Sequence, residues 1–124
     1  MAARPIAVTV VVWICQILAA VQFFLAGSAK LTGAPMMIGV FDAVGVGQWL
    51  RFVTGAIEVI GAVLLLIPAV AAIGAALLAM TMVGAIIAHF TVIPVPPTMP
   101  VILLIMVGIV FWVRRPRIFR AITT

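Results

Sequence analysis

A single carboxylate, Glu58, stands inside a stretch that otherwise has the composition of a membrane span, RFVTGAIEVIGAVLLLIP from Arg51 to Pro68. An ionised group in hydrocarbon is costly, so it must be paired, protonated or hydrated. Lys30 and Arg51 are the candidate partners of opposite charge, and the sequence does not decide between them. A carboxylate in this setting predicts a polar pocket that could admit water or a ligand headgroup.

The other ionisable side chains between the two terminal regions are few, and they fall in the same part of the predicted structure. Laid out on helices that rise about 1.5 Å per residue, they all lie in the half of the membrane away from the termini, and the amide of Gln22 lies level with Glu58. We predict a ligand-binding polar pocket made of Glu58, Lys30, His89, Arg51, Gln22 and Asp42. Glu58 is its centre, and His89 and Gln22 form part of its wall.

The residue types in this predicted pocket exclude several chemistries. One histidine with two carboxylates at different depths does not match the ligand spacings of metal sites, so no metal is predicted. No nucleophile stands beside a base, which leaves hydrolysis without support. Cys15 is the single cysteine, so the chain cannot form an internal disulfide or a CxxC redox pair. No catalytic residue and no intrinsic cofactor are assigned, and whether the chain catalyses a reaction stays open.

A purely structural interpretation of the same residues also stays open. A Lys–Glu pair can fix the register of two helices, and Gln22 can hydrogen-bond between helices. His89 can bond to a backbone carbonyl at the membrane surface. The ligand hypothesis and the structural hypothesis are distinguished by substitution rather than by sequence.

The elements that must position these residues are predicted from composition. The chain has 124 residues, 68% of them hydrophobic and 7% charged, and its mean hydropathy is +1.51, which is typical of an integral membrane protein. Four apolar blocks, at about 6–29, 51–67, 69–91 and 98–113, are each near the length that crosses a hydrocarbon core of about 30 Å. Alternation at period two is absent, so the prediction is an all-α four-helix bundle in one transmembrane domain, 1–124.

The segment between the first two spans has its own pattern. Met36, Met37, Val40, Phe41 and Val44 repeat at helical spacing and predict a short amphipathic helix on the external surface. Such a helix could act as a lid over the pocket or simply cap the bundle, and both interpretations stay open.

Basic residues predict the topology. Arg114, Arg115, Arg117 and Arg120 follow the last span and Arg4 precedes the first, so both termini are expected in the cytoplasm of a multi-pass protein of a bacterial-type inner membrane. The first apolar block is about twice as long as the apolar region of a signal peptide, so we expect it to remain as a helix. The arginine cluster suits anionic lipid headgroups and explains most of the net charge of +5, so no nucleic acid partner is predicted.

Small residues predict where helices approach one another. Gly55 and Ala62 share a stripe with Glu58, which indicates a packed face. A second row, Gly74, Leu78, Thr81 and Ala85, leads us to expect a homo-oligomer, although such faces can equally pack within one chain.

Three segments carry a resemblance to a known family: FFLAGSAKL, FDAVGVGQWLRFVTGAIEVIGAVLLLIP and AMTMVGAIIAHF. In this order and spacing they resemble the DoxX-like family of small four-helix membrane proteins. The resemblance implies a place in redox, oxidative-stress or detoxification systems linked to quinones, and it implies that the family's Lys, Glu and His fall on Lys30, Glu58 and His89. Because the chain lacks a recognisable soluble redox domain, electron transfer would need a redox protein partner or a bound cofactor.

The function expected from these observations is an accessory subunit of a redox or quinone-linked system, with a quinone or a membrane lipid bound in the polar pocket. A membrane scaffold or assembly factor without catalysis is the alternative. A small-molecule transporter is the least supported class, since broken helices and inverted repeats are not evident.

Overall fold

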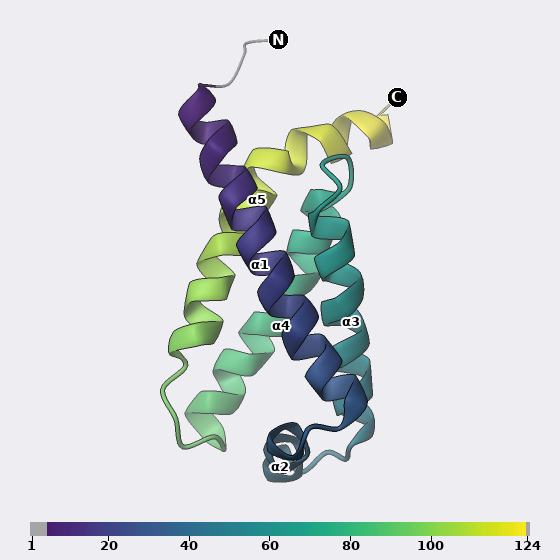
Figure 1. The fold of residues 1–124 in the computed structure, drawn as a ribbon, viewed down its shortest axis with the longest axis vertical. Coiled ribbons are helices and arrows are strands. Elements are labelled where there is room, and N and C mark those ends of the chain that lie inside the picture. The colour runs from purple at the N-terminus through teal and green to yellow at the C-terminus, as the bar shows by residue number, and fades with distance from the viewer. Residues whose placement is uncertain (1–4, 124) are drawn as a thin grey trace.

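A computed structural model describes residues 5–123, with side chains over 5–117, and across this range the chain forms five helices and no strand. They are α1 (Ile6–Thr32), α2 (Pro35–Val44), α3 (Trp49–Leu65), α4 (Ala71–Thr91) and α5 (Thr98–Thr123). Helices α1 and α4 each contact both α3 and α5, so the four long helices form a closed ring (Figure 1). The predicted all-α bundle with a short helix between the first two spans is therefore confirmed.

Three helices in the described range are long and apolar enough to cross a membrane: α1, α4 and the Thr98–Arg117 part of α5. Helix α3 has 17 residues, about 25 Å at 1.5 Å per residue. It meets α2 at a bend of 119°, and the two together make a fourth candidate span. These helices are consistent with a multi-pass membrane protein.

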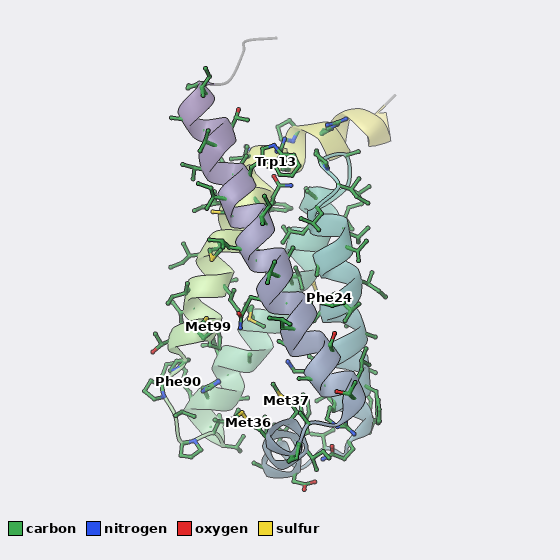
Figure 2. The ribbon with its side chains drawn as sticks, in the orientation of Figure 1. Trp13, Phe24, Met36, Met37, Phe90 and Met99 are labelled. Carbon is green, nitrogen blue, oxygen red and sulfur yellow. The ribbon has the colours of Figure 1, made fainter. Side chains whose placement is uncertain are left out.

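Helix α2 lies across the end of the bundle opposite the two termini (Figure 1). Gly33 ends α1 with φ of 76° and Gly45 ends α2 with φ of 79°, a left-handed conformation that glycine adopts without steric cost. Pro35 starts α2 at a position where its missing N–H is not needed. The predicted apolar face is turned inward in part, because Phe41 is buried and Met37 points toward the bundle (Figure 2), whereas Met36 is exposed.

Two helix boundaries differ from the predicted spans for reasons that involve proline. Helix α3 ends at Leu65 rather than at residue 67, because a residue before proline disfavours the helical conformation and Pro68 follows closely. Helix α5 continues ten residues past the predicted end at 113, with Pro116 inside it. Past the bundle, its last part turns across the end where both termini lie (Figure 1), as expected where a proline removes a helical hydrogen bond.

The core is made mostly of small and medium apolar residues from all four long helices, and Phe23 is its largest member. Its fully buried members are Val12, Ala19, Phe23, Leu65, Ala71, Ala75, Leu78, Val107 and Val110. Large apolar side chains such as Phe24 and Phe90 point outward instead (Figure 2). An apolar exterior around helices that pack closely through small residues is the arrangement that a lipid solvent favours.

The row of small residues on α4 packs inside the chain at its first two positions. A β-carbon added at Gly74 would lie 2.9 Å from the carbonyl oxygen of Gly61, and one added at Gly61 would lie 2.7 Å from Cγ of Leu78. Helices α3 and α4 therefore meet backbone to backbone at this point. Gly74 and Leu78 are buried against α3, so they do not form a surface for a second copy.

Candidate functional site

Helices α1 and α3 come into backbone contact at Gly27 and Gly55. A β-carbon added at Gly27 would lie 2.8 Å from the carbonyl oxygen of Gly55, and one added at Gly55 would lie 3.0 Å from the carbonyl oxygen of Gly27. Both distances are shorter than ordinary van der Waals contact, and the first leaves no room for a side chain. The expectation that small residues on α3 allow close helix approach is confirmed at Gly55.

Each of these glycines stands three residues before one member of an ion pair. The β-carbon of Glu58 lies 3.1 Å from the place of a β-carbon on Gly27, and that of Lys30 lies 3.0 Å from the place of a β-carbon on Gly55. Residues three apart share a helix face. The G-x-x-K of α1 and the G-x-x-E of α3 thus fit each other reciprocally, because each glycine makes room for the charged residue of the opposite helix.

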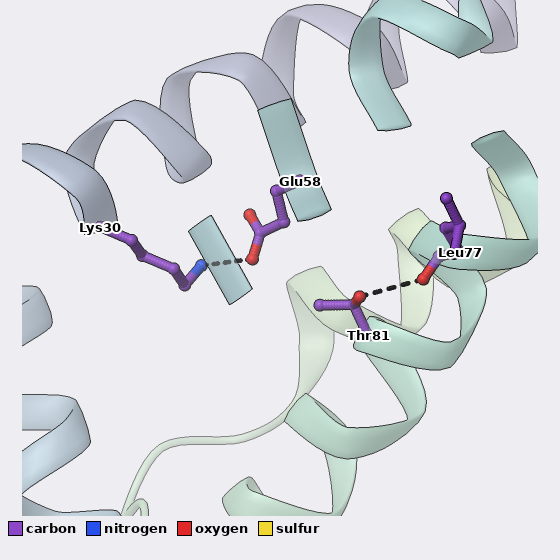
Figure 3. A network of polar contacts seen from close by, with 4 residues as sticks. All are labelled: Lys30, Glu58, Leu77 and Thr81. Carbon is purple, nitrogen blue, oxygen red and sulfur yellow. Dashed lines mark hydrogen bonds and ion pairs between the residues drawn. The ribbon is translucent and has the colours of Figure 1, made fainter. Parts of the chain in front are cut away.

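The ion pair itself joins α1 to α3 in the interior. Lys30 Nζ donates to Glu58 Oε1 at 2.6 Å, and the side chains are 13% and 1% exposed, respectively (Figure 3). Of the two partners that the sequence left open, Lys30 is therefore the one that contacts Glu58. The pair meets the requirement that a carboxylate near the middle of a membrane-spanning helix be neutralised by a close opposite charge.

The second carboxylate oxygen of Glu58 has no such partner. Oε2 is buried and accepts no hydrogen bond from the described residues. In Figure 3, Thr81 of α4 is drawn on the side of Glu58 away from Lys30. Its hydroxyl donates to the carbonyl oxygen of Leu77 at 3.0 Å and not to Glu58 Oε2. A buried acceptor without a donor is uncommon, and it marks the point at which a ligand or water could bind.

Arg51 hydrogen-bonds to the C-terminal end of α1 and does not pair with Glu58. Its Nη1 donates to the main-chain oxygen of Lys30, and its Nε donates to Gln48 Oε1 at 2.7 Å. The guanidinium also lies 4.3 Å from the ring centre of Phe52. The carbonyl of Lys30 is one of those that a helix C-terminus leaves unpaired, so Arg51 caps α1 from α3.

Asp42 joins the same network from α2. Gln48 Nε2 donates to Asp42 Oδ1 at 2.8 Å and to the carbonyl oxygen of Ile38 at 3.1 Å. A continuous chain of hydrogen bonds therefore runs from Asp42 through Gln48 and Arg51 to the backbone of Lys30, whose side chain reaches Glu58. Four of the six predicted pocket residues belong to it, and Gln48 is a member that the sequence did not suggest.

His89 and Gln22 are not part of this network. His89 Nδ1 lies 2.8 Å from the carbonyl oxygen of Val95, and since a carbonyl only accepts, Nδ1 carries the proton and donates. The contact ties the last turn of α4 to the proline-rich link before α5. Gln22 is half-buried on α1 and makes no side-chain hydrogen bond within the described residues. The prediction that these two side chains line the wall beside Glu58 is not supported by any contact.

A second buried polar cluster lies nearer the termini, and no role for its central residue, Gln16, is predicted from the sequence. Gln16 is fully buried, and its Nε2 donates to the carbonyl oxygen of Leu65, the last residue of α3, at 2.7 Å. Arg114 Nε and Nη2 donate to Gln16 Oε1 at 3.0 and 2.9 Å, and the guanidinium lies 5.3 Å from the ring centre of Trp13. Arg114, expected among the headgroups, instead turns inward and joins α5 to α1.

Two apolar grooves lie on the surface, one beside the pair and one at the termini end between α1 and α5, and neither is lined by Lys30 or Glu58. One of about 250 Å³ runs between α1 and α3, lined by Ile17, Ala20, Val21, Phe24, Leu25, Ala62, Val63 and Leu66. Ala62 stands one turn from Glu58 on α3. The predicted pocket is thus a closed polar interior next to an apolar groove, and among the described residues no three His, Cys, Asp or Glu side chains come together.

Comparison with known proteins identifies the family of the chain. Residues 14–111, which include both motifs of the α1–α3 crossing, match the DoxX-like family. Neither the curated proteins nor the solved structures contain a match to the chain. The match covers well over half of the sequence, and the chain therefore belongs to the DoxX-like family.

Proposed function

We propose that this DoxX-like membrane protein is an accessory subunit of a redox system and that Glu58 and Lys30 bind the polar headgroup of a quinone-type molecule drawn from the membrane. The observation that carries the proposal is the buried Glu58 Oε2 without a hydrogen-bond donor. A hydroxyl on a reduced headgroup would supply that donor. The quinone, when bound, supplies the two-electron chemistry, and a redox protein partner supplies or removes the electrons.

The residues around the pair fit such a molecule. Glu58 offers an acceptor at Oε2, while Lys30 Nζ has three N–H groups of which the described contacts use one. The α1–α3 groove is apolar, and its volume is comparable to cavities that bind benzene-sized molecules, so part of an apolar tail can lie in it. The headgroup reaches the pair by a local separation of α1 and α3, or by movement of α2, which then serves as a lid.

The experiment is a replacement that exchanges an acceptor for a donor at constant shape. In Glu58→Gln the amide oxygen faces Lys30 Nζ, as Oε1 does now, and the NH₂ group then stands where Oε2 stood. The variant keeps its bond to Lys30 but cannot accept a hydrogen bond from a bound hydroxyl. Lipids and quinones extracted from protein purified in mild detergent are then quantified by mass spectrometry.

We expect one quinone-class molecule per chain in the parent protein and in the control Gln22→Leu, which alters a polar residue of α1 outside the network. We expect its loss in folded Glu58→Gln protein, whose melting temperature is lowered because the Lys30 ammonium has lost its carboxylate. Absence of any such molecule from the parent, or equal retention in Glu58→Gln, would contradict the proposal.

A scaffold or assembly role is the second candidate, and the reciprocal fit of the two G-x-x motifs favours it. In that role the ion pair fixes helix register, and no ligand is needed. The neutral double variant Lys30→Met/Glu58→Gln distinguishes the two functions. A scaffold keeps its cellular phenotype if this variant folds, whereas a ligand-binding subunit loses it.

A further inference from the structure

The end of the bundle that holds the termini carries positive charge without acidic side chains to balance it. The chain has two acidic residues, Asp42 and Glu58, and these are bonded to Gln48 and Lys30 toward the other end. The arginines after the last span therefore have no carboxylate side chain of their own chain nearby. Their counter-ions must come from the surroundings.

One of these arginines, Arg115, stacks on a tryptophan of the same helix. The guanidinium carbon of Arg115 lies 3.7 Å from the ring centre of Trp112, which is 66% exposed. Within the described residues Arg115 Nε is shielded from solvent and has no hydrogen-bond partner. Arg117 is exposed. Stacking on the indole fixes the plane of a group whose planar fork matches a phosphate.

The course of α5 suits both arginines to the level of the lipid headgroups. Arg114 is drawn into the bundle by Gln16, which anchors the helix at this level. Beyond it the chain passes Pro116, and the ribbon runs across the end of the bundle rather than away from it (Figure 1). Tryptophan is enriched at the same depth of a bilayer as lipid headgroups, so Trp112 is suited to mark that level.

We propose that Trp112 and Arg115 form a binding site for the phosphate of an anionic phospholipid in the leaflet at the termini end, and that Arg117 adds charge at this level. Arg115, held flat on Trp112, donates to the phosphate. Arg117 lies two residues further on, on another side of the helix, and adds positive charge at the same end of the bundle. The lipid supplies the missing counter-ion and holds the last part of α5 on the membrane surface. This site is separate from the Lys30–Glu58 pair and does not depend on the function proposed for that pair.

The test measures lipid preference of the full chain. Protein in mild detergent is mixed with equal amounts of phosphatidylglycerol and phosphatidylcholine, and retained lipids are counted by native mass spectrometry. Basic residues near a bilayer surface each favour anionic lipid by about fivefold. We expect the parent to retain phosphatidylglycerol with at least that preference, and Arg115→Gln/Arg117→Gln to retain the two lipids nearly equally.

Two further variants separate charge from geometry. Arg115→Lys/Arg117→Lys keeps the charge and should keep most of the preference, whereas Trp112→Leu removes the stacking surface and should lower it at unchanged charge. An unchanged preference in the Gln double variant overturns the proposal. So does a parent that shows no lipid preference but retains an acidic protein, because the arginines would then serve a protein contact.

Discussion

The β-carbon of Glu58 lies where a side chain on Gly27 would need space, at 3.1 Å from the position of the missing β-carbon. The glycine and the carboxylate are therefore parts of one arrangement, since the first allows α3 to approach α1 and the second is enclosed by that approach. The same relation holds between Gly55 and Lys30. The ion pair is buried as a consequence of the helix crossing, and the crossing depends on two missing side chains.

Gly27→Ala should destabilise the protein, because its β-carbon would meet the carbonyl oxygen of Gly55 at 2.8 Å, and backbone cannot move aside as a side chain can. Overpacking of this kind costs about 1–3 kcal/mol. Thermal unfolding in detergent measures the change. Gly84→Ala is the matched control, since nothing lies within 4 Å of its β-carbon position and the substitution should be neutral. Equal melting temperatures for both variants would contradict the close backbone contact of α1 and α3 at Gly27 and Gly55.

Removing the cation of the buried pair should cost more than neutralising both members. Lys30→Met leaves a buried carboxylate without its donor, and breaking a buried pair in this way costs about 3–5 kcal/mol. Adding Glu58→Gln removes the unpaired charge and should restore most of the stability. The comparison of both variants with the parent by unfolding in detergent checks this order. A double variant less stable than Lys30→Met would show that the charges do not interact.

Gln16→Leu and Gln22→Leu should differ sharply, although both remove an amide from the same helix. Gln16 is the partner of the Leu65 carbonyl and of Arg114, and leaving buried polar groups unpaired costs about 1–3 kcal/mol each. Gln22 makes no hydrogen bond within the described residues, so its loss should be nearly neutral. Yield and melting temperature of the two variants measure the difference. A larger effect at Gln22 would mean that the amides have been assigned the wrong roles.

Arg51→Leu should loosen α2 while leaving the bundle folded. The substitution removes the donor to the Lys30 carbonyl and the bond to Gln48, which in turn holds Asp42. Hydrogen exchange should rise in the segment from Gly33 to Gln48. Exchange in α4 is the internal control and should not change. If α2 exchanges at the parent rate, apolar contacts alone hold it in place.

The predicted topology can be tested at three threonines. Thr32 ends α1 and Thr98 begins α5, at the same end of the bundle as α2. Cysteine at either position should react with an impermeant maleimide added outside the cell, because the arginine-rich ends are expected in the cytoplasm. Cysteine at Thr124, outside the described residues, should react only after the membrane is permeabilised. The reverse pattern would invert the orientation.

The sequence predicts what depends on composition and on spacing within one helix. The apolar blocks, the helix at Pro35–Val44 and the need of Glu58 for a cation all follow from such local information. The partner of Arg51 does not, because a backbone carbonyl leaves no trace in residue types. Gln16 was missed for a related reason. Its hydrogen-bond partners are a carbonyl at the end of α3 and an arginine 98 positions away. These groups come together only where the helices cross.

Helix α2 is joined to its neighbours in a way that makes it replaceable. Its ten residues lie between two glycines in left-handed conformation, and among the described residues the side chain that hydrogen-bonds to it is that of Gln48. The crossing at Gly27 and Gly55 includes none of its residues. A different surface helix that keeps an acceptor for Gln48 could therefore be grafted between Gly33 and Gly45. Such chimaeras would allow the outer face of the protein to be redesigned while the buried ion pair stays as it is.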